Sequence, residues 1–274
     1  MGMQHKLKLS SLRRGFTLIE LSVVLLIISL MLGGILTIQN QKIRAERLAE
    51  TNMKLDAISK ALYNYRLIHG ALPCPGDSSL ASTHANFGLQ ANGASCDSGG
   101  TINSNHNSDA PYDTFGGSVP VTTLGLPSDY AVDAWGAYFT YYLHKGASNA
   151  SNFATGTSAV DVSANAIIVK DESGTTISTN NIFAIVLSHG PNGHGAYLPS
   201  GSGVPKNSGS SNTNEENNCM CDNTANADLQ PNFTIIVQQR TRDDYTDAST
   251  QFDDIVRFMP KDFYYTPSEI KASQ

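Results

Sequence analysis

One long apolar segment constrains what this chain can fold into. Phe16 to Ile38 is a run of 23 residues with a single ionisable side chain, Glu20. At about 1.5 Å of rise per residue, a helix of this length reaches about 34 Å, which is enough to cross a hydrocarbon core of roughly 30 Å. A carboxylate inside such a helix is unfavourable, so we expect Glu20 to have a partner or a purpose. The segment predicts a membrane-spanning helix that carries one functional acid.

The residues that lead into this helix form a distinctive pattern. Residues 13–20 read Arg-Arg-Gly-Phe-Thr-Leu-Ile-Glu, after a leader that also carries Lys6 and Lys8. The pattern resembles the prepilin signal of type IV pilins and type II secretion pseudopilins. In that family a dedicated peptidase cuts after the glycine and methylates the new amino terminus. The resemblance implies cleavage between Gly15 and Phe16, so that Glu20 becomes the fifth residue of the mature chain.

Two other kinds of signal account for this region less well. An ordinary secretory signal has an apolar core of about 7–15 residues followed by a small-residue cleavage site. Here the apolar run is longer, and residues 36–40 offer no such site. A plain signal anchor explains the length and the basic flank but leaves Glu20 unexplained. The pattern therefore favours the prepilin-type signal, with the plain anchor as the main alternative.

Length and net charge limit the partners and the domain organisation of the remainder of the chain. The 274 residues carry a net charge of −6, and most Lys and Arg lie before residue 70. The distal part is acidic, which argues against nucleic acid as a partner. We divide the chain into a leader (1–15), a transmembrane and assembly helix (16–38), an amphipathic helix (39–70) and one globular head (71–274). The resemblance places the protein in the bacterial inner membrane, with a single span and the head in the periplasm.

An amphipathic pattern follows the apolar run. Three leucines recur every seven residues: Leu48, Leu55 and Leu62. Three positions after each of them come Thr51, Ile58 and Tyr65, respectively. This spacing predicts a helix with one apolar stripe. Because the pattern ends after three repeats, we expect the stripe to pack on the protein's own sheet, with a coiled coil as the alternative. Gly70 is expected to cap the helix, and Pro73 prevents its continuation.

The rest of the chain predicts short strands separated by long polar segments. Each strand-like run is β-branched or aromatic and is bounded by Gly, Pro, Asn or Asp; the runs are 137–144, 166–170, 182–188, 233–238 and 255–259. Residues 74–120 are rich in Ser, Asn, Gly and Asp, and we expect an irregular loop there. Strands that follow one long helix predict an α+β fold, with an antiparallel sheet packed on the helix and long loops between the strands.

Four cysteines allow three disulfide pairings. They are consistent with an oxidising compartment. We favour Cys74–Cys96, which closes a loop after the long helix, together with Cys219–Cys221 as a small local ring. Zinc is the alternative, although a zinc site needs a second close pair of ligands at regular spacing.

Three short segments of the head also resemble secretion pseudopilins. Residues 133–136 resemble their Asp-x-Trp-Gly turn, residues 188–193 their Ser-x-Gly-x-Asp/Asn-Gly loop, and residues 253–256 their closing acidic turn and last strand. In the major pseudopilins the corresponding loop binds calcium. The resemblance implies Asn192, Asp253 and Asp254 as oxygen donors for Ca²⁺, which prefers six to eight such ligands. The alternative is that these residues only form turns.

The sequence favours a structural subunit over an enzyme. It contains no Gly-x-Ser-x-Gly elbow, no phosphate-binding loop and no His-Glu-x-x-His motif. His189 and His194 lie in a segment rich in Gly and Pro, where they cannot form a helical metal-binding pair. The resemblance implies the prepilin peptidase and other pilin or pseudopilin subunits as partners. Because the head loops are long, we expect a minor or specialised subunit, either an adhesive pilin or a secretion pseudopilin; a membrane-tethered periplasmic enzyme or binding domain is the alternative.

Overall fold

The computed structural model describes residues 15–91, 96, 114–150, 167–178, 182–201, 212–218, 235–237 and 252–260. Within the first helix, the side chains of residues 31–38 and 40 lie outside this description. The chain divides into two compact units, Met1–Glu46 and Arg47–Gln274. The leader before Gly15 lies outside the described residues.

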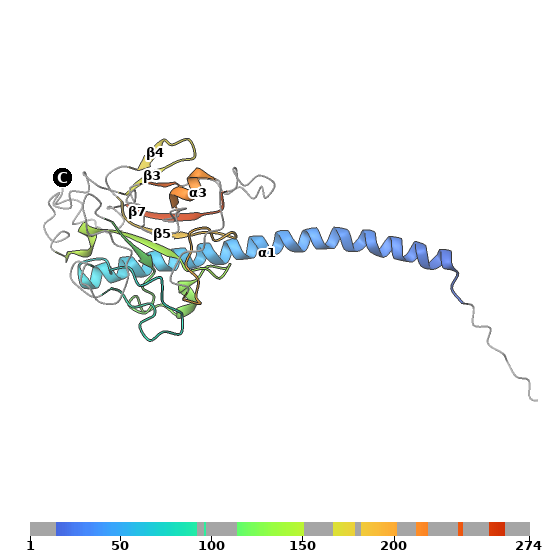
Figure 1. Ribbon diagram of the computed structural model, residues 1–274, viewed down its shortest axis with the longest axis horizontal. Helices are drawn as coiled ribbons and strands as arrows, with labels where there is room; N and C mark the ends of the chain where they lie inside the picture. The colour runs from blue at the N-terminus through green and yellow to red at the C-terminus, as the bar shows by residue number, and fades with distance from the viewer. Residues whose placement is uncertain are drawn as a thin grey trace, which may run out of the picture. The chain divides into compact units, whose positions relative to one another are not determined.

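Helix α1 (Leu18–His69) is the longest element and contributes to both units (Figure 1). Over the part of the chain that the structure describes, no helix is both long enough and apolar enough to cross a membrane. The span expected at 16–38 includes residues 31–38, whose side chains are outside the described set.

The later turns of α1 belong to the core of the second unit. Leu55, Ile58 and Leu62 are fully buried and share one hydrophobic cluster with Tyr141 and Phe183 of the sheet. The prediction that this stripe packs on the protein's own sheet is therefore confirmed. The prediction is wrong for Leu48, the first residue expected in the stripe. Leu48 is 40% exposed, and the buried stripe begins one turn later, at Thr51.

The end of α1 is also as expected. Gly70 has a φ of +75°, a backbone conformation that favours glycine, and its N–H donates to the carbonyl of Arg66 at 2.8 Å. The chain then turns away from the helix axis into Pro73 and Cys74.

A four-stranded antiparallel sheet forms the centre of the head. Its strands are β1 (Thr114–Ser118), β2 (Thr140–His144), β5 (Ile182–Ser188) and β7 (Ile255–Pro260), in the order β1-β2-β5-β7. Strand β5 is buried along its whole length because both of its faces are covered. Phe183 and Val186 face the cluster that contains α1, whereas Ile185 and Leu187 face a second apolar cluster. The α+β class with an antiparallel sheet is thus confirmed.

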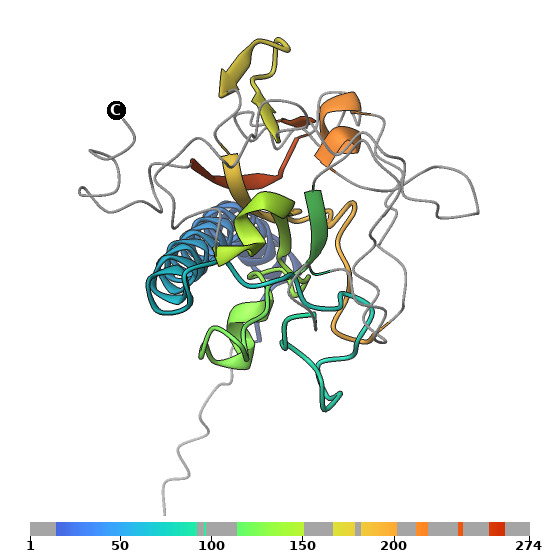
Figure 2. The ribbon, with the colours of Figure 1, turned by 90° about the vertical axis from the view of Figure 1, so that its left-hand side faces the viewer.

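A smaller sheet departs from the expected pattern. It consists of β3 (Ile168–Lys170), β4 (Thr176–Ser178) and β6 (Ile235–Val237), in the order β4-β3-β6. Strands β3 and β4 are antiparallel, but β3 and β6 are parallel. A parallel pair requires a long connection, and many residues separate these two strands. Two short 3₁₀ turns, Ser128–Ala131 and Lys145–Ser148, and the helix α3 (Thr213–Asn218) complete the described elements (Figure 2).

Strand β1 corrects the expectation of an irregular loop over 74–120. Its sequence, Thr-Phe-Gly-Gly-Ser, has weak strand character, yet all five residues are buried and paired with β2. Gly117 is required here because a Cβ on it would collide with the carbonyl oxygen of Gly76. The backbones of Gly76 and Ser118 bond to each other in both directions, which covers the outer edge of the strand.

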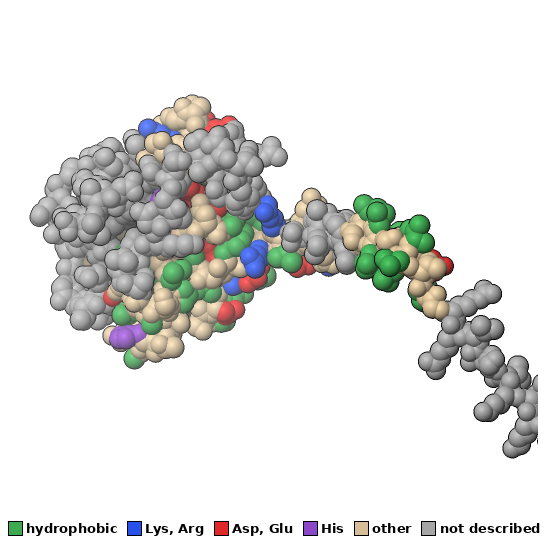
Figure 3. Space-filling view, turned by 45° about the vertical axis from the view of Figure 1, so that its right-hand side comes forward, with side chains coloured by type: hydrophobic (Ala, Val, Ile, Leu, Met, Phe, Trp, Pro, Cys, Tyr) green, Lys and Arg blue, Asp and Glu red, His purple; other side chains and the backbone are tan. Residues whose placement is uncertain are grey.

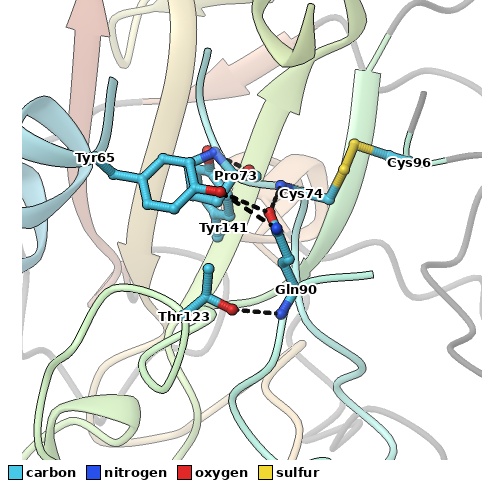
Figure 4. The surroundings of a disulfide bond; sticks show 7 residues. All are labelled: Tyr65, Pro73, Cys74, Gln90, Cys96, Thr123 and Tyr141. Carbon is cyan, nitrogen blue, oxygen red and sulfur yellow. Dashed lines mark hydrogen bonds between the residues drawn. A yellow bond between two sulfur atoms is a disulfide. The ribbon is translucent and has the colours of Figure 1, made fainter. Parts of the chain in front are cut away.

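The disulfide between Cys74 and Cys96 is present, as predicted, with a Cα–Cα distance of 5.4 Å (Figure 4). Gln90 holds the segment that the bond closes: its Oε1 accepts from the Cys74 N–H at 3.1 Å, and its own N–H donates to Thr123 Oγ1 at 2.8 Å. The pairing expected for Cys219 and Cys221 lies outside the described residues.

Candidate functional site

The first turn of α1 is closed by a reciprocal pair of side chains. Glu20 Oε2 accepts from both the backbone N–H and the hydroxyl of Thr17, each at 2.9 Å. The N–H of Glu20 donates back to Thr17 Oγ1 at 3.3 Å. This is a capping box, in which Thr17 is the N-cap and Glu20 satisfies backbone groups that a helix start leaves open. The helix therefore begins at Leu18, and the acid of the apolar segment is held by its own helix.

The side chains around this turn form an apolar surface. Phe16 is 86% exposed and Leu18 is 88% exposed. Hydrophobic side chains gather on these turns of the helix (Figure 3), and the exposed ones are Phe16, Leu18, Ile19, Leu21, Val23, Val24, Leu25, Leu26, Ile27, Ile28 and Leu30. A continuous apolar surface of this size marks an interaction with lipid or with other protein chains.

Gly15, at the expected cleavage site, has no structural reason to be glycine in this fold. A Cβ added there meets no atom of the described residues within 4 Å, and its φ is not among the positive values.

A second candidate site lies in the head, where three carboxylates meet in the interior. Glu215 belongs to α3, and Asp253 and Asp254 immediately precede β7. Oxygen atoms of the three lie within 4.8 Å of one another, and all three residues are buried. We call Glu215, Asp253 and Asp254 the acid cluster. Burying like charges so close together is costly unless a cation or protons compensate them.

Neighbouring amides orient the acid cluster. Asn192 donates from its backbone N–H to Asp253 Oδ2 at 3.0 Å and from its side chain to Glu215 Oε1 at 2.7 Å. Asn218 donates to Asp254 Oδ2 at 2.8 Å. Within the described residues, Glu215 Oε2 and Asp254 Oδ1 have no hydrogen-bond partner. Glu215 and Asp254 thus each present one oriented and one open oxygen.

His189 lies against the acid cluster without neutralising it. Its Nε2 is 2.9 Å from Thr140 Oγ1, and its Nδ1 is 3.7 Å from Asp254 Oδ1. Burial, with a smaller contribution from His194, lowers the pKa of His189 to about 3, so the ring is neutral near pH 7. Burial also raises the pKa of Asp254 well above its usual value, and the charges of Glu215 and Asp253 raise it further.

The donor set of the acid cluster suits a hard divalent cation such as calcium. All of its open atoms are carboxylate oxygens, which is the ligand type that Ca²⁺ prefers. Of the residues that the resemblance suggested, Asp253 and Asp254 are in the cluster. Asn192 lies beside it, but its side-chain oxygen accepts from the His194 N–H at 2.7 Å, so Asn192 acts here by orienting Glu215.

Sequence reasoning missed Glu215. It lies in the long polar segment after β5, 38 positions before Asp253. The only local signal is an acidic pair at positions 215 and 216, which is ordinary for a solvated loop. Only the fold brings this carboxylate to the turn before β7.

Two of the head motifs meet at Asp133. Its Oδ1 accepts from the N–H groups of Trp135 and Ala137, at 2.9 and 3.0 Å, which shapes the turn before β2. Its Oδ2 accepts from the hydroxyl of Ser188 at 2.6 Å, at the end of β5. Burial raises the pKa of Asp133 despite these bonds. The side chain therefore joins the turn at 133–136 to the loop at 188–193.

The chain carries a prepilin-type signal. Residues 10–36 match the family model of the prokaryotic N-terminal methylation motif, which is the signal of type IV pilins and pseudopilins. The match covers the end of the leader, Gly15, the capping box and most of the apolar run. No curated protein and no solved structure matches the chain.

Proposed function

We propose that this chain is a structural subunit, minor or specialised, of a type IV pilus or a type II secretion pseudopilus. The observation that carries the proposal is the methylation motif at residues 10–36. The exposed apolar surface from Phe16 to Leu30 supports it, because this surface needs a cover of lipid before assembly and of neighbouring helices afterwards. The proposed role is mechanical and involves no catalytic step.

In the proposed sequence of events, the precursor enters the inner membrane with its head in the periplasm. Prepilin peptidase then cuts between Gly15 and Phe16. The new amino terminus of Phe16 is a cation in an apolar setting, four residues from the Glu20 carboxylate. That spacing corresponds to about 6 Å along a helix axis.

The same two charged groups, the Phe16 amine and the Glu20 carboxylate, direct assembly in this proposal. A neighbouring subunit displaced by about that rise brings its own Phe16 amine level with this Glu20. A buried charge pair is tolerated only in a demanding geometry, so it sets the register between subunits, whereas the apolar side chains supply attraction without register. Glu20 must then exchange its bonds to Thr17 for the amine of a neighbour.

The test of processing is the intact mass of the protein from its native host. We expect a mature chain that begins at Phe16 and carries one methyl group. Gly15→Val should leave full-length precursor in the membrane, with an unchanged thermal unfolding curve because the fold has room for the larger side chain. A mature start at Met1 or beyond about residue 40, or normal processing of Gly15→Val, would contradict the proposal.

Filaments sheared from the cell surface distinguish a pilus from a secretion pseudopilus. A pilus subunit is recovered in the sheared fraction at low abundance relative to a major subunit. A pseudopilus subunit stays with the cell envelope under the same conditions. Failure to co-purify with any filament or other pilin-like subunit would argue for a tethered domain of another function.

We also propose that the acid cluster binds calcium. The open oxygens of Glu215 and Asp254 and the burial of all three carboxylates support this assignment. Bound calcium would supply the positive charge that the neutral His189 does not. Titration calorimetry of the full-length protein in detergent tests the assignment: we expect one site in the wild type and at least about tenfold weaker binding in Asp254→Asn. Equal binding by the two proteins would contradict it.

A further inference from the structure

We propose that a divalent cation at the acid cluster docks α3 onto the four-stranded sheet, and that Glu215 is the side chain that makes this docking cation-dependent. The inference rests on the proposed calcium site and goes beyond it: the ion would control the position of one element of the head.

Neither its length nor the burial of apolar side chains accounts for the stability of helix α3. It has six residues, Thr-Asn-Glu-Glu-Asn-Asn, which is too short for a helix to be stable by itself. None of the six is hydrophobic, so burial of apolar surface does not anchor it. Nevertheless, Glu215 and Asn218 are completely buried.

Polar contacts hold α3 on the sheet. Glu215 accepts from Asn192, and Asn218 donates to Asp254. The hydroxyl of Tyr142 on β2 donates to the backbone carbonyl of Asn218 at 3.4 Å. Helix α3 also lies against β6, which pairs with β3, so its docking extends to the smaller sheet (Figure 1).

Repulsion between the carboxylates opposes these contacts when neither a cation nor protons compensate their charges. Docking brings the Glu215 carboxylate within 4.8 Å of oxygens of Asp253 and Asp254, in a site closed to water. The repulsion acts only when α3 is docked, because an undocked α3 leaves Glu215 in solvent. A divalent cation shared by the three carboxylates reverses the sign of this interaction, and it therefore binds the docked state more tightly than the undocked state.

Hydrogen exchange of the full-length protein in detergent, measured by mass spectrometry, tests the inference. The probe is calcium chloride, compared with a chelator. In the wild type we expect amides in residues 212–218 to exchange at least about tenfold more slowly with calcium, because linkage to a ligand at 10 times its dissociation constant gives a factor of that order. Peptides from β5 should exchange equally in both conditions, since β5 is buried on both faces.

Two variants distinguish a specific role of Glu215 from the general effect of removing one negative charge. Glu215→Gln keeps an oxygen that accepts from Asn192 but removes the repulsion, so exchange in residues 212–218 should become independent of calcium. The matched control is Glu172→Gln in the β3–β4 turn, where the side chain is exposed; it should behave as the wild type does. Continued calcium dependence in Glu215→Gln would overturn the role of Glu215.

The wild-type measurement decides the inference even if a variant fails to fold. Calcium binding by calorimetry without a change in exchange at 212–218 would overturn the docking inference and leave the calcium site standing. An absence of calcium binding would overturn both.

Discussion

For the Glu20 carboxylate we distinguish two partners, and we propose that it uses them at different stages. In the full chain the carboxylate closes a capping box with Thr17. In an assembled filament it would pair with the amine of a neighbouring Phe16. The first role needs only a hydrogen-bond acceptor, whereas the second needs a negative charge.

The substitution Glu20→Gln separates these two roles, because glutamine also closes a capping box but is neutral. We expect insertion and cleavage after Gly15 to continue, while incorporation into filaments falls by roughly tenfold or more. Glu20→Asp, which is shorter by one methylene, should be intermediate, and Glu20→Val should be at least as impaired as Glu20→Gln. The measurement is the filament-to-membrane ratio of the subunit at equal expression. Normal incorporation of Glu20→Gln would show that charge pairing at Glu20 does not set the register.

Asp133 is the residue on which the turn before β2 and the end of β5 both depend. Asp133→Ala removes the acceptor for two backbone groups and one buried hydroxyl. Because unsatisfied buried donors cost about 1–3 kcal/mol each, we expect a loss of at least about 3 kcal/mol in the free energy of unfolding. Asp133→Asn keeps the Oδ1 acceptor and should lose less. Chemical denaturation of the two variants and the wild type measures the difference; equal stability of Asp133→Ala and wild type would contradict the role.

The raised pKa of Asp133 also predicts a pH dependence. Its ordinary value is 3.8, and burial raises it in the folded state. The folded protein then holds the proton more tightly than the unfolded chain does, so this group's contribution to stability is greatest below 3.8 and declines as the pH rises through the folded pKa. The stability of the wild type relative to Asp133→Asn should therefore fall with rising pH over that window. A flat or rising difference would be inconsistent with a raised pKa.

At the scale of elements, the disulfide fixes the segment that follows α1. The bond between Cys74 and Cys96 joins positions 22 apart and places Gln90 against Tyr65 and Cys74 (Figure 4). We expect Cys74→Ser together with Cys96→Ser to lower the free energy of unfolding by about 2–4 kcal/mol. Denaturant unfolding under non-reducing conditions measures the loss, and the matched control is Cys219→Ser together with Cys221→Ser. Recovery of a Cys96–Cys219 peptide on non-reducing mapping would show that the pairing is wrong.

At the scale of the whole molecule, the two compact units carry different proposed tasks. Glu20 belongs to the unit Met1–Glu46, and the acid cluster belongs to the unit Arg47–Gln274. Substitutions without shared partners usually have additive effects. We therefore expect Asp254→Asn to leave cleavage after Gly15 unchanged and Glu20→Gln to leave the calcium affinity of the head unchanged. A combined variant should show the sum of the two single effects; a defect larger than that sum would indicate that the units act on each other.

The elements that were predictable share one property: their signal is local. The prepilin-type signal lies in consecutive residues and was confirmed by the methylation motif at 10–36. The buried stripe of α1 follows from helical spacing, its end from Gly70, and β5 from an apolar run whose bounds matched. The cysteine pair at 74 and 96 was also correct.

The features that were missed depend on residues far apart in the chain. Strand β1 has little strand character of its own and exists because β2 and the Gly76 backbone pair with its two edges. The parallel pairing of β3 with β6 joins segments that no local pattern relates. Glu215 looks like an ordinary loop acid, and it becomes part of a candidate cation site only because the fold carries α3 to the turn before β7. Periodicity and short motifs in the sequence therefore established the signal, the long helix and the central strand, whereas burial and pairing between distant segments decided the outer strand, the second sheet and the acid cluster.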